Sequence, residues 1–220
     1  MKNSPFYIVA FMVLMAAVFG AGVTGIYLAS QGTLERNRAF LRERSLVEAF
    51  GIGDTRQLTK NQVLELVEKR IEQDDTIRDP ESGWETPLLK AYEPDGKTLI
   101  GYGFMFRGPG FWAPIEGILA VSPDLTTTIG MTIVQQAETP GLGGRITEPI
   151  FTKQFREGIL ISPPENGPHI RVGAADKANP RQVDAITGAT QTSMAMERIL
   201  NDALEAFHRA LSARGGARSG

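Results

Sequence analysis

The chain has 220 residues, which is enough for one full-sized domain with appendages but leaves little room for a second. Its 23 Lys and Arg against 25 Asp and Glu give a net charge of −2, so nucleic acid is not an expected partner. The absence of cysteine excludes disulfides, thiolate-bound iron–sulfur clusters and cysteine nucleophiles, and only two histidines argue against a metal or haem site. Any redox chemistry therefore needs an organic cofactor.

The first feature along the chain is an uncharged stretch at residues 5–30, after a short tail at residues 1–4. As a helix this stretch is long enough to cross the roughly 30 Å of bilayer hydrocarbon. A cleaved signal peptide is the alternative, but the apolar region is longer than the usual ~7–15 residues. We therefore expect a retained transmembrane helix.

The charges around this stretch do not establish its orientation. Lys2 precedes it, and the positive-inside rule places the more basic flank in the cytoplasm. The other flank carries more positive charge, which opposes an external position for the rest of the chain. The basic residues on that flank are Arg36, Arg38, Arg42 and Arg44.

Residues 31–79 are predicted to form a helical linker region. A first helix is expected to continue from the anchor and to end at Gly51. A second helix is expected to begin at Thr59, with Gln62 completing a capping box, and to carry Ile71 on its inner face.

Residues 80–212 are predicted to form one α+β domain, an antiparallel sheet flanked by helices. Strand-like runs separated by turns indicate a meander, and two helices are expected to follow it. The strand-like runs cover residues 88–93, 98–106, 115–122 and 126–136, and the helices residues 149–157 and 193–211. The tail at residues 213–220 is expected to be disordered.

A threonine-rich segment lies directly before the last predicted helix. It reads Asp184, Ala185, Ile186, Thr187, Gly188, Ala189 and Thr190. A helix N-terminus offers free N–H groups and the positive end of the dipole, which suits a phosphate group. Simple capping of the helix by a hydroxyl side chain is the alternative.

The full pattern Asp-x-x-Thr-Gly-Ala-Thr resembles the flavinylation motif of the FMN-binding domain family. From average residue usage it arises by chance in roughly one chain of this length in 2,000. The resemblance implies that a flavin transferase joins the phosphate of FMN to the hydroxyl of Thr190 as a phosphoester. It also implies that Asp184, Thr187, Gly188 and Ala189 belong to the cofactor site. Thr187 is expected to hydrogen-bond the turn and Thr192 to cap the helix.

A second segment, Glu138-Thr139-Pro140-Gly141-Leu142-Gly143, matches a loop of the same family. Proline and glycine at these positions predict a tight exposed turn that can pass beside a flat ring. The resemblance therefore implies flavin contacts from Glu138, Thr139, Gly141 and Leu142. Taken alone, the segment also fits a plain turn at the end of a strand.

The resemblance extends to a Gly-Phe-Trp segment at residues 110–112, where Trp112 is a weaker candidate for stacking on the flavin. One departure is Gln136, which stands where relatives often have histidine. Its effect on the flavin does not follow from the sequence.

The family resemblance implies a membrane-anchored electron-transfer subunit that carries covalent FMN. Its nearest relatives in architecture are the G subunit of the Rnf electron-transport complex and the C subunit of the sodium-translocating NADH:quinone oxidoreductase. It implies other membrane subunits as partners, an extracytoplasmic domain at the bacterial inner membrane, and no catalysis by this chain alone. The alternatives are a tethered FMN protein that serves another reductase without ion pumping, and a non-redox scaffold.

Overall fold

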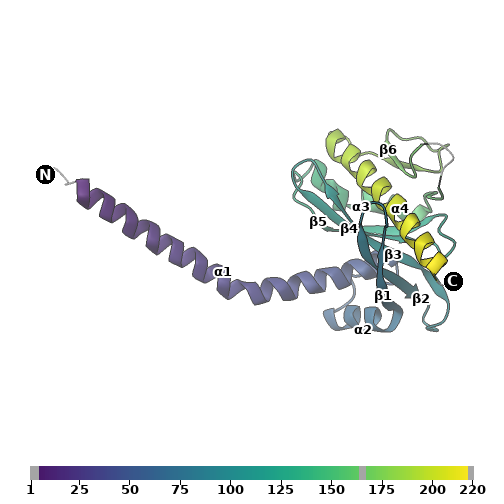
Figure 1. Cartoon of the computed structure of the whole chain (residues 1–220), viewed down its shortest axis with the longest axis horizontal. Coiled ribbons are helices and arrows are strands. Elements are labelled where there is room, and N and C mark those ends of the chain that lie inside the picture. Colours follow the sequence, from purple (N-terminus) through teal and green to yellow (C-terminus); the bar gives the residue numbers. More distant parts are fainter. Residues whose placement is uncertain (1–4, 164–166, 218–220) are drawn as a thin grey trace. The chain divides into compact units, whose positions relative to one another are not determined.

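The computed structural model describes residues 5–163 and 167–217. The chain divides into two compact units, Met1–Leu41 and Arg42–Gly220 (Figure 1). The expected N-terminal tail at residues 1–4 lies outside the described residues, as do residues 218–220. The first helix, α1 (Pro5–Phe50), begins in the first unit and ends in the second.

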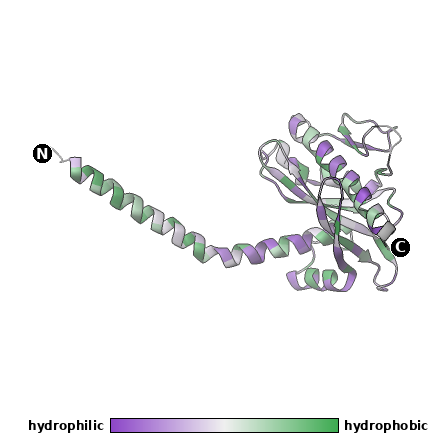
Figure 2. Cartoon of the chain, viewed as in Figure 1, coloured by the Kyte–Doolittle hydropathy of each residue, from purple (hydrophilic) through white to green (hydrophobic). Residues whose placement is uncertain are grey.

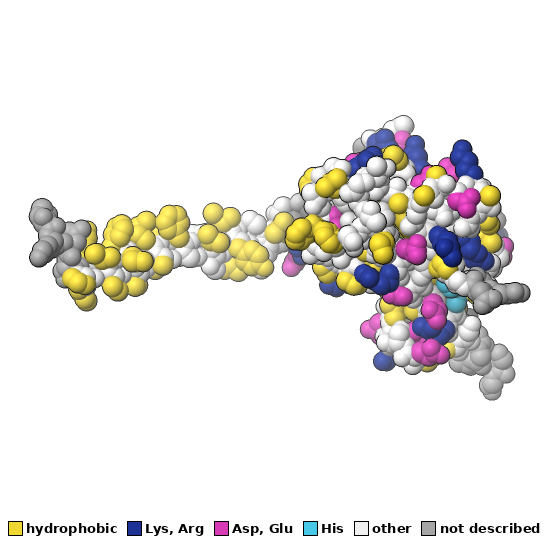
Figure 3. Space-filling view, turned by 90° about the horizontal axis from the view of Figure 1, so that it is seen from above, with side chains coloured by type: hydrophobic (Ala, Val, Ile, Leu, Met, Phe, Trp, Pro, Cys, Tyr) yellow, Lys and Arg dark blue, Asp and Glu magenta, His cyan; other side chains and the backbone are white. Residues whose placement is uncertain are grey.

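In the first unit, α1 carries no charged residue over residues 5–30. Its most apolar 18-residue window has a mean hydropathy of 2.4, and none of that window is buried. Figure 2 shows the run of hydrophobic residues along this part of α1, and Figure 3 shows the apolar side chains that cover it. By length and composition this helix can cross a membrane.

The two predicted linker helices are present. α1 continues without a break to Phe50, as expected from the sequence. α2 (Lys60–Arg70) begins at the predicted capping box, in which Gln62 N–H donates to the Thr59 side chain and the Gln62 side chain accepts from Thr59 N–H.

Five strands form one antiparallel sheet in the order β1-β2-β3-β4-β5. Each strand pairs with the next along the chain, so the predicted meander is confirmed, and so is the α+β class. The strands are β1 (Ile71–Arg78), β2 (Glu85–Tyr92), β3 (Leu99–Pro109), β4 (Pro114–Val121) and β5 (Thr128–Gln135).

The first strand corrects the prediction of helix through residue 79. The backbone at Ile71 is extended, and residues 71–78 pair with β2. Two adjacent acidic residues in this segment hide its strand character in the sequence. Asp74 is stabilised there by ion pairs with Lys90 and Arg214, which are contacts between distant parts of the chain.

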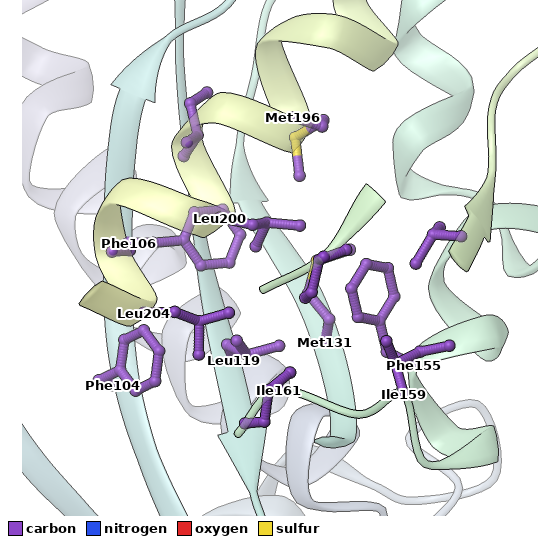
Figure 4. Close-up of a cluster of buried hydrophobic side chains, with 14 of the residues drawn as sticks. Phe104, Phe106, Leu119, Met131, Phe155, Ile159, Ile161, Met196, Leu200 and Leu204 are labelled. Atoms are coloured by element: carbon purple, nitrogen blue, oxygen red, sulfur yellow. The ribbon is translucent and has the colours of Figure 1, made fainter. Parts of the chain in front are cut away.

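The sheet buries apolar side chains on both faces, because successive residues of a strand point to opposite sides. In β4, Leu119 faces the core under α4, whereas Ile118 and Ala120 face the end of α1 around Phe50. Figure 4 shows Leu200 and Leu204 of α4 directed toward strand side chains such as Phe104, Phe106 and Leu119.

Short elements connect the sheet to the last helix. The predicted helix at residues 149–157 is present as α3 (Pro149–Thr152) followed by the 3₁₀ helix η2 (Lys153–Glu157), and the 3₁₀ helix η1 (Gly143–Thr147) precedes it. A parallel pair of strands, β6 (Arg171–Gly173) and β7 (Gln182–Asp184), was not predicted, because three residues are too few for a periodic signal.

The last helix, α4 (Thr190–Ala217), begins three residues before the predicted start and continues into the segment expected to be disordered. Its predicted inner face is confirmed, with Met196, Leu200 and Phe207 buried. The tail prediction is wrong for residues 213–217, because Arg214 forms an ion pair with Asp74 of β1 at 3.0 Å. The last three residues of that tail lie outside the described part of the chain.

Candidate functional site

The threonine motif forms a tight turn between β7 and α4. The N–H of Ala189 donates to the carbonyl of Ile186 at 3.0 Å, which closes the turn. Gly188 has a φ of +80°, a left-handed conformation that a side chain would strain. α4 then begins at Thr190, which is exposed. No hydrogen-bond partner for the Thr190 hydroxyl is present among residues 5–163 and 167–217.

A glutamine from η2 fixes the start of this motif. The Gln154 side chain accepts from Asp184 N–H at 2.6 Å and donates to the Asp184 carbonyl at 3.3 Å. Both backbone groups of Asp184 are thereby held, while its side chain is exposed. Gln154 was not among the predicted site residues, since nothing in the primary structure links it to a motif that begins 30 residues later.

Two hydroxyl groups near Thr190 do not have their predicted roles. The Thr187 side chain is exposed and makes no hydrogen bond to the turn among the residues that the structure describes. Ser193 ties the turn instead, since its Oγ accepts from Ile186 N–H at 3.2 Å. Thr192 does not cap α4. Its hydroxyl is buried and donates to Glu138 Oε2 at 2.8 Å.

The second motif forms the predicted tight turn after β5. The Thr139 carbonyl accepts from Leu142 N–H at 3.1 Å, and Gly141 has a φ of +75°. A proline followed by a glycine with positive φ is the composition of a type II turn. Gln136 holds the entrance of the loop, since its side-chain oxygen accepts from Glu138 N–H at 2.6 Å.

Glu138 is the buried centre of the site, with 4% of its surface exposed. Its Oε1 accepts from the N–H groups of Phe111 and Trp112 at 2.8 and 2.9 Å, and its Oε2 accepts from Thr192. The same carboxylate therefore binds the Gly-Phe-Trp segment and the start of α4. Hydrogen bonds to a carboxylate are stronger than hydrogen bonds between neutral groups. These three bonds offset the cost of burying the Glu138 side chain.

Two glycines leave the space that this carboxylate occupies. A β-carbon on Gly110 would lie 2.6 Å from Glu138 Oε1, and one on Gly143 would collide with Thr192 Oγ1. Neither position leaves room for a side chain. Gly143, the last residue of the second motif, is thus required by the contact between Glu138 and Thr192.

Exposed apolar side chains stand on the segments that Glu138 joins. Trp112 is 69% exposed and stands edge-to-face with the exposed Phe111. Leu142 lies over the threonine turn, since its Cδ2 is 3.5 Å from where a β-carbon of Gly188 would stand. Met194, one helical turn after Thr190, is 59% exposed. Met194 was not predicted as a site residue. It falls outside the predicted inner face of α4, so its exposure agrees with the helical pattern.

Arg198 lies on α4, two helical turns after Thr190. Its guanidinium donates to the carbonyl of Pro109 at 3.1 Å, beside the Gly-Phe-Trp segment. In the described part of the chain, no group of three or more His, Cys, Asp or Glu side chains could hold a metal ion.

A family model matches the segment that contains these residues. Residues 110–205 match the FMN-binding domain family, and this segment contains both motifs and the Gly-Phe-Trp segment. The resemblance to the FMN-binding domain family is confirmed. The match ends within α4, and it begins at the glycine that makes room for Glu138.

Among similar proteins are C subunits of the Na⁺-translocating NADH-quinone reductase. The chain is 40% identical to the one from Pasteurella multocida over 89 residues, which span 40% of this chain and only 34% of that protein. It is 28% identical to the one from Pseudomonas aeruginosa, over 88% of this chain and 90% of that protein.

Solved structures have the same fold. NqrC from Shewanella oneidensis aligns with a TM-score of 0.66 at 20% identity, covering 81% of this chain and 98% of that one. The corresponding reductase protein from Parabacteroides distasonis aligns with a TM-score of 0.67 at 20% identity, covering 81% and 95%. At this identity the likeness shows the fold alone.

Proposed function

We propose that Thr190 carries FMN as a phosphoester and that the chain is a membrane-anchored electron-transfer subunit of an Nqr-type complex. The observation that carries this proposal is the exposed Thr190 hydroxyl at the start of a helix, within the segment that matches FMN-binding domains. This hydroxyl has no hydrogen-bond partner among the residues that the structure describes. The similar C subunits favour an Nqr-type complex over an Rnf-type complex.

The start of α4 fits the phosphate of FMN. The first N–H groups of a helix have no intrahelical acceptor and lie at the positive end of its dipole, so they stabilise an anion. Gly188 has no side chain, and Ala189 is small and buried, so the approach to Thr190 is open. In the attachment step the Thr190 oxygen forms a bond to the phosphorus of FMN, and the bond from that phosphorus to the leaving group of the flavin donor breaks. The hydroxyl proton of Thr190 departs with the leaving group, and a flavin transferase carries out this exchange.

The exposed apolar side chains fit the isoalloxazine ring. Phe111, Trp112, Leu142 and Met194 offer apolar surface beside the attachment point, and Thr139 and Gly141 stand on the adjoining exposed turn. The phosphoester joins only the ribityl tail, so the ring keeps its redox chemistry when it is bound. We assign the contact with the ring to these side chains.

The apolar part of α1 is proposed as a single-pass anchor in the bacterial inner membrane. The soluble unit then lies on the extracytoplasmic side, a placement that rests on the family resemblance because the arginines after the anchor oppose it. The other redox centres and the quinone site belong to partner membrane subunits. This chain alone relays electrons and does not catalyse the overall reaction.

Intact mass of the full chain, produced with and without a flavin transferase, tests the attachment. The wild-type chain should gain the mass of one FMN less one water only with the transferase. Thr190→Val removes the hydroxyl and keeps the shape, so this variant should fold, reach the membrane fraction and lack the added mass. Covalent FMN on Thr190→Val would refute the assignment.

The complex is tested separately, by purification in mild detergent. The wild-type chain should bring with it the membrane subunits of an Nqr-type reductase. Recovery with a cytochrome or another reductase instead would support the tethered flavoprotein without ion pumping.

A further inference from the structure

We propose that Glu138 is a positioning residue that fixes the Phe111–Trp112 segment relative to the flavin attachment turn. This inference rests on the proposed function, because it assumes that Thr190 carries the flavin. It assigns to Glu138 a role different from the cofactor contact that the family loop implies. The carboxylate holds two parts of the site together and does not itself touch the ring.

The burial of Glu138 supports this role. Only 4% of its surface is exposed, and both of its oxygens accept hydrogen bonds from the protein. A buried carboxylate is costly unless such partners surround it. Its partners come from two other segments, residues 110–112 and α4. The hydrogen bonds of the carboxylate therefore connect these two segments.

The positions of the donors determine what the carboxylate fixes. Thr192 is in the first turn of α4, two residues after Thr190, so a bond to Thr192 also holds Thr190 in place. The other oxygen binds two consecutive backbone N–H groups, those of Phe111 and Trp112. The backbone that carries the two exposed aromatic rings is therefore held at a set position relative to the start of α4.

The close fit of two glycines shows how tightly the segments pack around this carboxylate. Side chains on Gly110 or Gly143 would collide with Glu138 or with Thr192. A shorter side chain at position 138 cannot bridge the segments, because the backbone at residue 138 is itself held by Gln136. Loss of the carboxylate therefore frees the backbone of Phe111 and Trp112 from the attachment turn, while Arg198 still holds Pro109 against α4.

The test compares variants of the full chain in detergent after attachment of FMN. Glu138→Ala removes all three hydrogen bonds, Thr192→Val removes one of them, and Thr192→Ser keeps the hydroxyl and serves as the control. All of these should retain covalent FMN on Thr190. Flavin fluorescence anisotropy should fall in Glu138→Ala, fall less in Thr192→Val, and match the wild type in Thr192→Ser.

A second readout does not depend on the flavin. The backbone amides of Phe111 and Trp112 should exchange with solvent at least about tenfold faster in Glu138→Ala, because a hydrogen bond to a charged acceptor is lost. In Thr192→Val these amides should remain protected, since Oε1 keeps its donors. Amide exchange at Phe111 and Trp112 thus reports loss of the bonds to the aromatic segment, and it does not respond to loss of the bond to α4.

A matched control addresses general destabilisation. Asp79→Asn breaks the ion pair with Arg209, 19 residues after Thr190 on α4, and should lower stability without changing flavin anisotropy. The inference is overturned if Glu138→Ala frees the Trp112 amide but leaves the flavin as immobile as in the wild type. Absence of covalent FMN from the wild-type chain would instead refute the proposed function.

Discussion

The hydroxyl of Thr192 donates to the carboxylate of Glu138 at 2.8 Å, although the two residues are 54 positions apart in the sequence. Both side chains are buried, with 3% and 4% of their surface exposed. Glu138 belongs to the second motif, and Thr192 lies two residues after the last threonine of the first. The contact explains why both motifs occur together, since it holds the loop of one against the helix that begins at the other.

Thr192→Val should destabilise the folded domain by about 1–3 kcal/mol, because it leaves a buried carboxylate oxygen without its donor. Thr192→Ser retains the hydroxyl and should cost much less. Thermal or urea unfolding of the full chain in detergent measures the difference. Equal stability of the Val and Ser variants would mean that the bond contributes nothing to the folded state.

Gly141→Ala should alter the flavin without preventing its attachment. The φ of Gly141 is +75°, and an L side chain there costs about 1–2 kcal/mol, so the turn that carries Thr139 and Leu142 should shift. The absorption spectrum or the reduction potential of the bound flavin should change, while intact mass still shows one FMN.

The control for this variant is Gly96→Ala. Gly96 has a φ of +65° in the turn between β2 and β3, which is remote from the motifs in the sequence. The Gly96→Ala substitution imposes backbone strain similar to that of Gly141→Ala, and it should leave the flavin spectrum unchanged. Loss of attachment in a folded Gly141→Ala protein would mean that the loop is recognised by the transferase.

The sequence predicted the meander and the inner face of α4 because alternation and helical periodicity determine which side chains are buried there. Leu119 and Leu200 follow these rules. β1 was missed because its Asp74 is stabilised by Lys90 and Arg214, and a local pattern does not contain such distant partners. The extension of α4 beyond its predicted end has the same cause.

At the site, the threonine turn could be predicted because Gly188 and the start of α4 are local features. The role of Thr192 could not, since capping is the local expectation and its actual partner is 54 residues away. Gln154 was missed for the same reason. The exposure of Met194 could have been predicted from helical periodicity, because this residue falls outside the apolar face of α4 that packs on the sheet.

The full chain should remain in the membrane fraction after washing with high salt and with carbonate. The apolar part of α1 has a mean hydropathy of 2.4 over 18 residues, which favours insertion over surface adsorption. A chain that lacks residues 1–30 should be released by the same washes. Release of the full chain would show that the helix does not span the bilayer.

The side of the membrane needs its own measurement. In cells stripped of their outer layer, added protease should digest the domain after residue 41 if it faces outward. Protection of the domain in intact cells, with digestion after lysis, would place it in the cytoplasm, in agreement with Arg36, Arg38, Arg42 and Arg44.

The ion pair between Asp79 and Arg209 should make stability depend on acid pH. Arg209 binds both oxygens of the buried Asp79 carboxylate at 3.0 and 2.8 Å, and with Ser82 it holds the pKa of Asp79 well below its usual range. A carboxyl group whose pKa is lowered by folding stabilises the protein above its unfolded pKa, about 3.9, and loses that contribution as the pH falls toward the folded pKa.

Wild-type stability should therefore decline below about pH 4. In Asp79→Asn the urea midpoint should be lower at pH 7, and the decline in acid should be shallower. The remaining decline comes from other carboxyl groups whose pKa is lowered in the folded protein, among them Asp74 beside Lys90 and Arg214. An Asp79→Asn protein with the same acid dependence as the wild type would show that this pair does not couple protonation to folding.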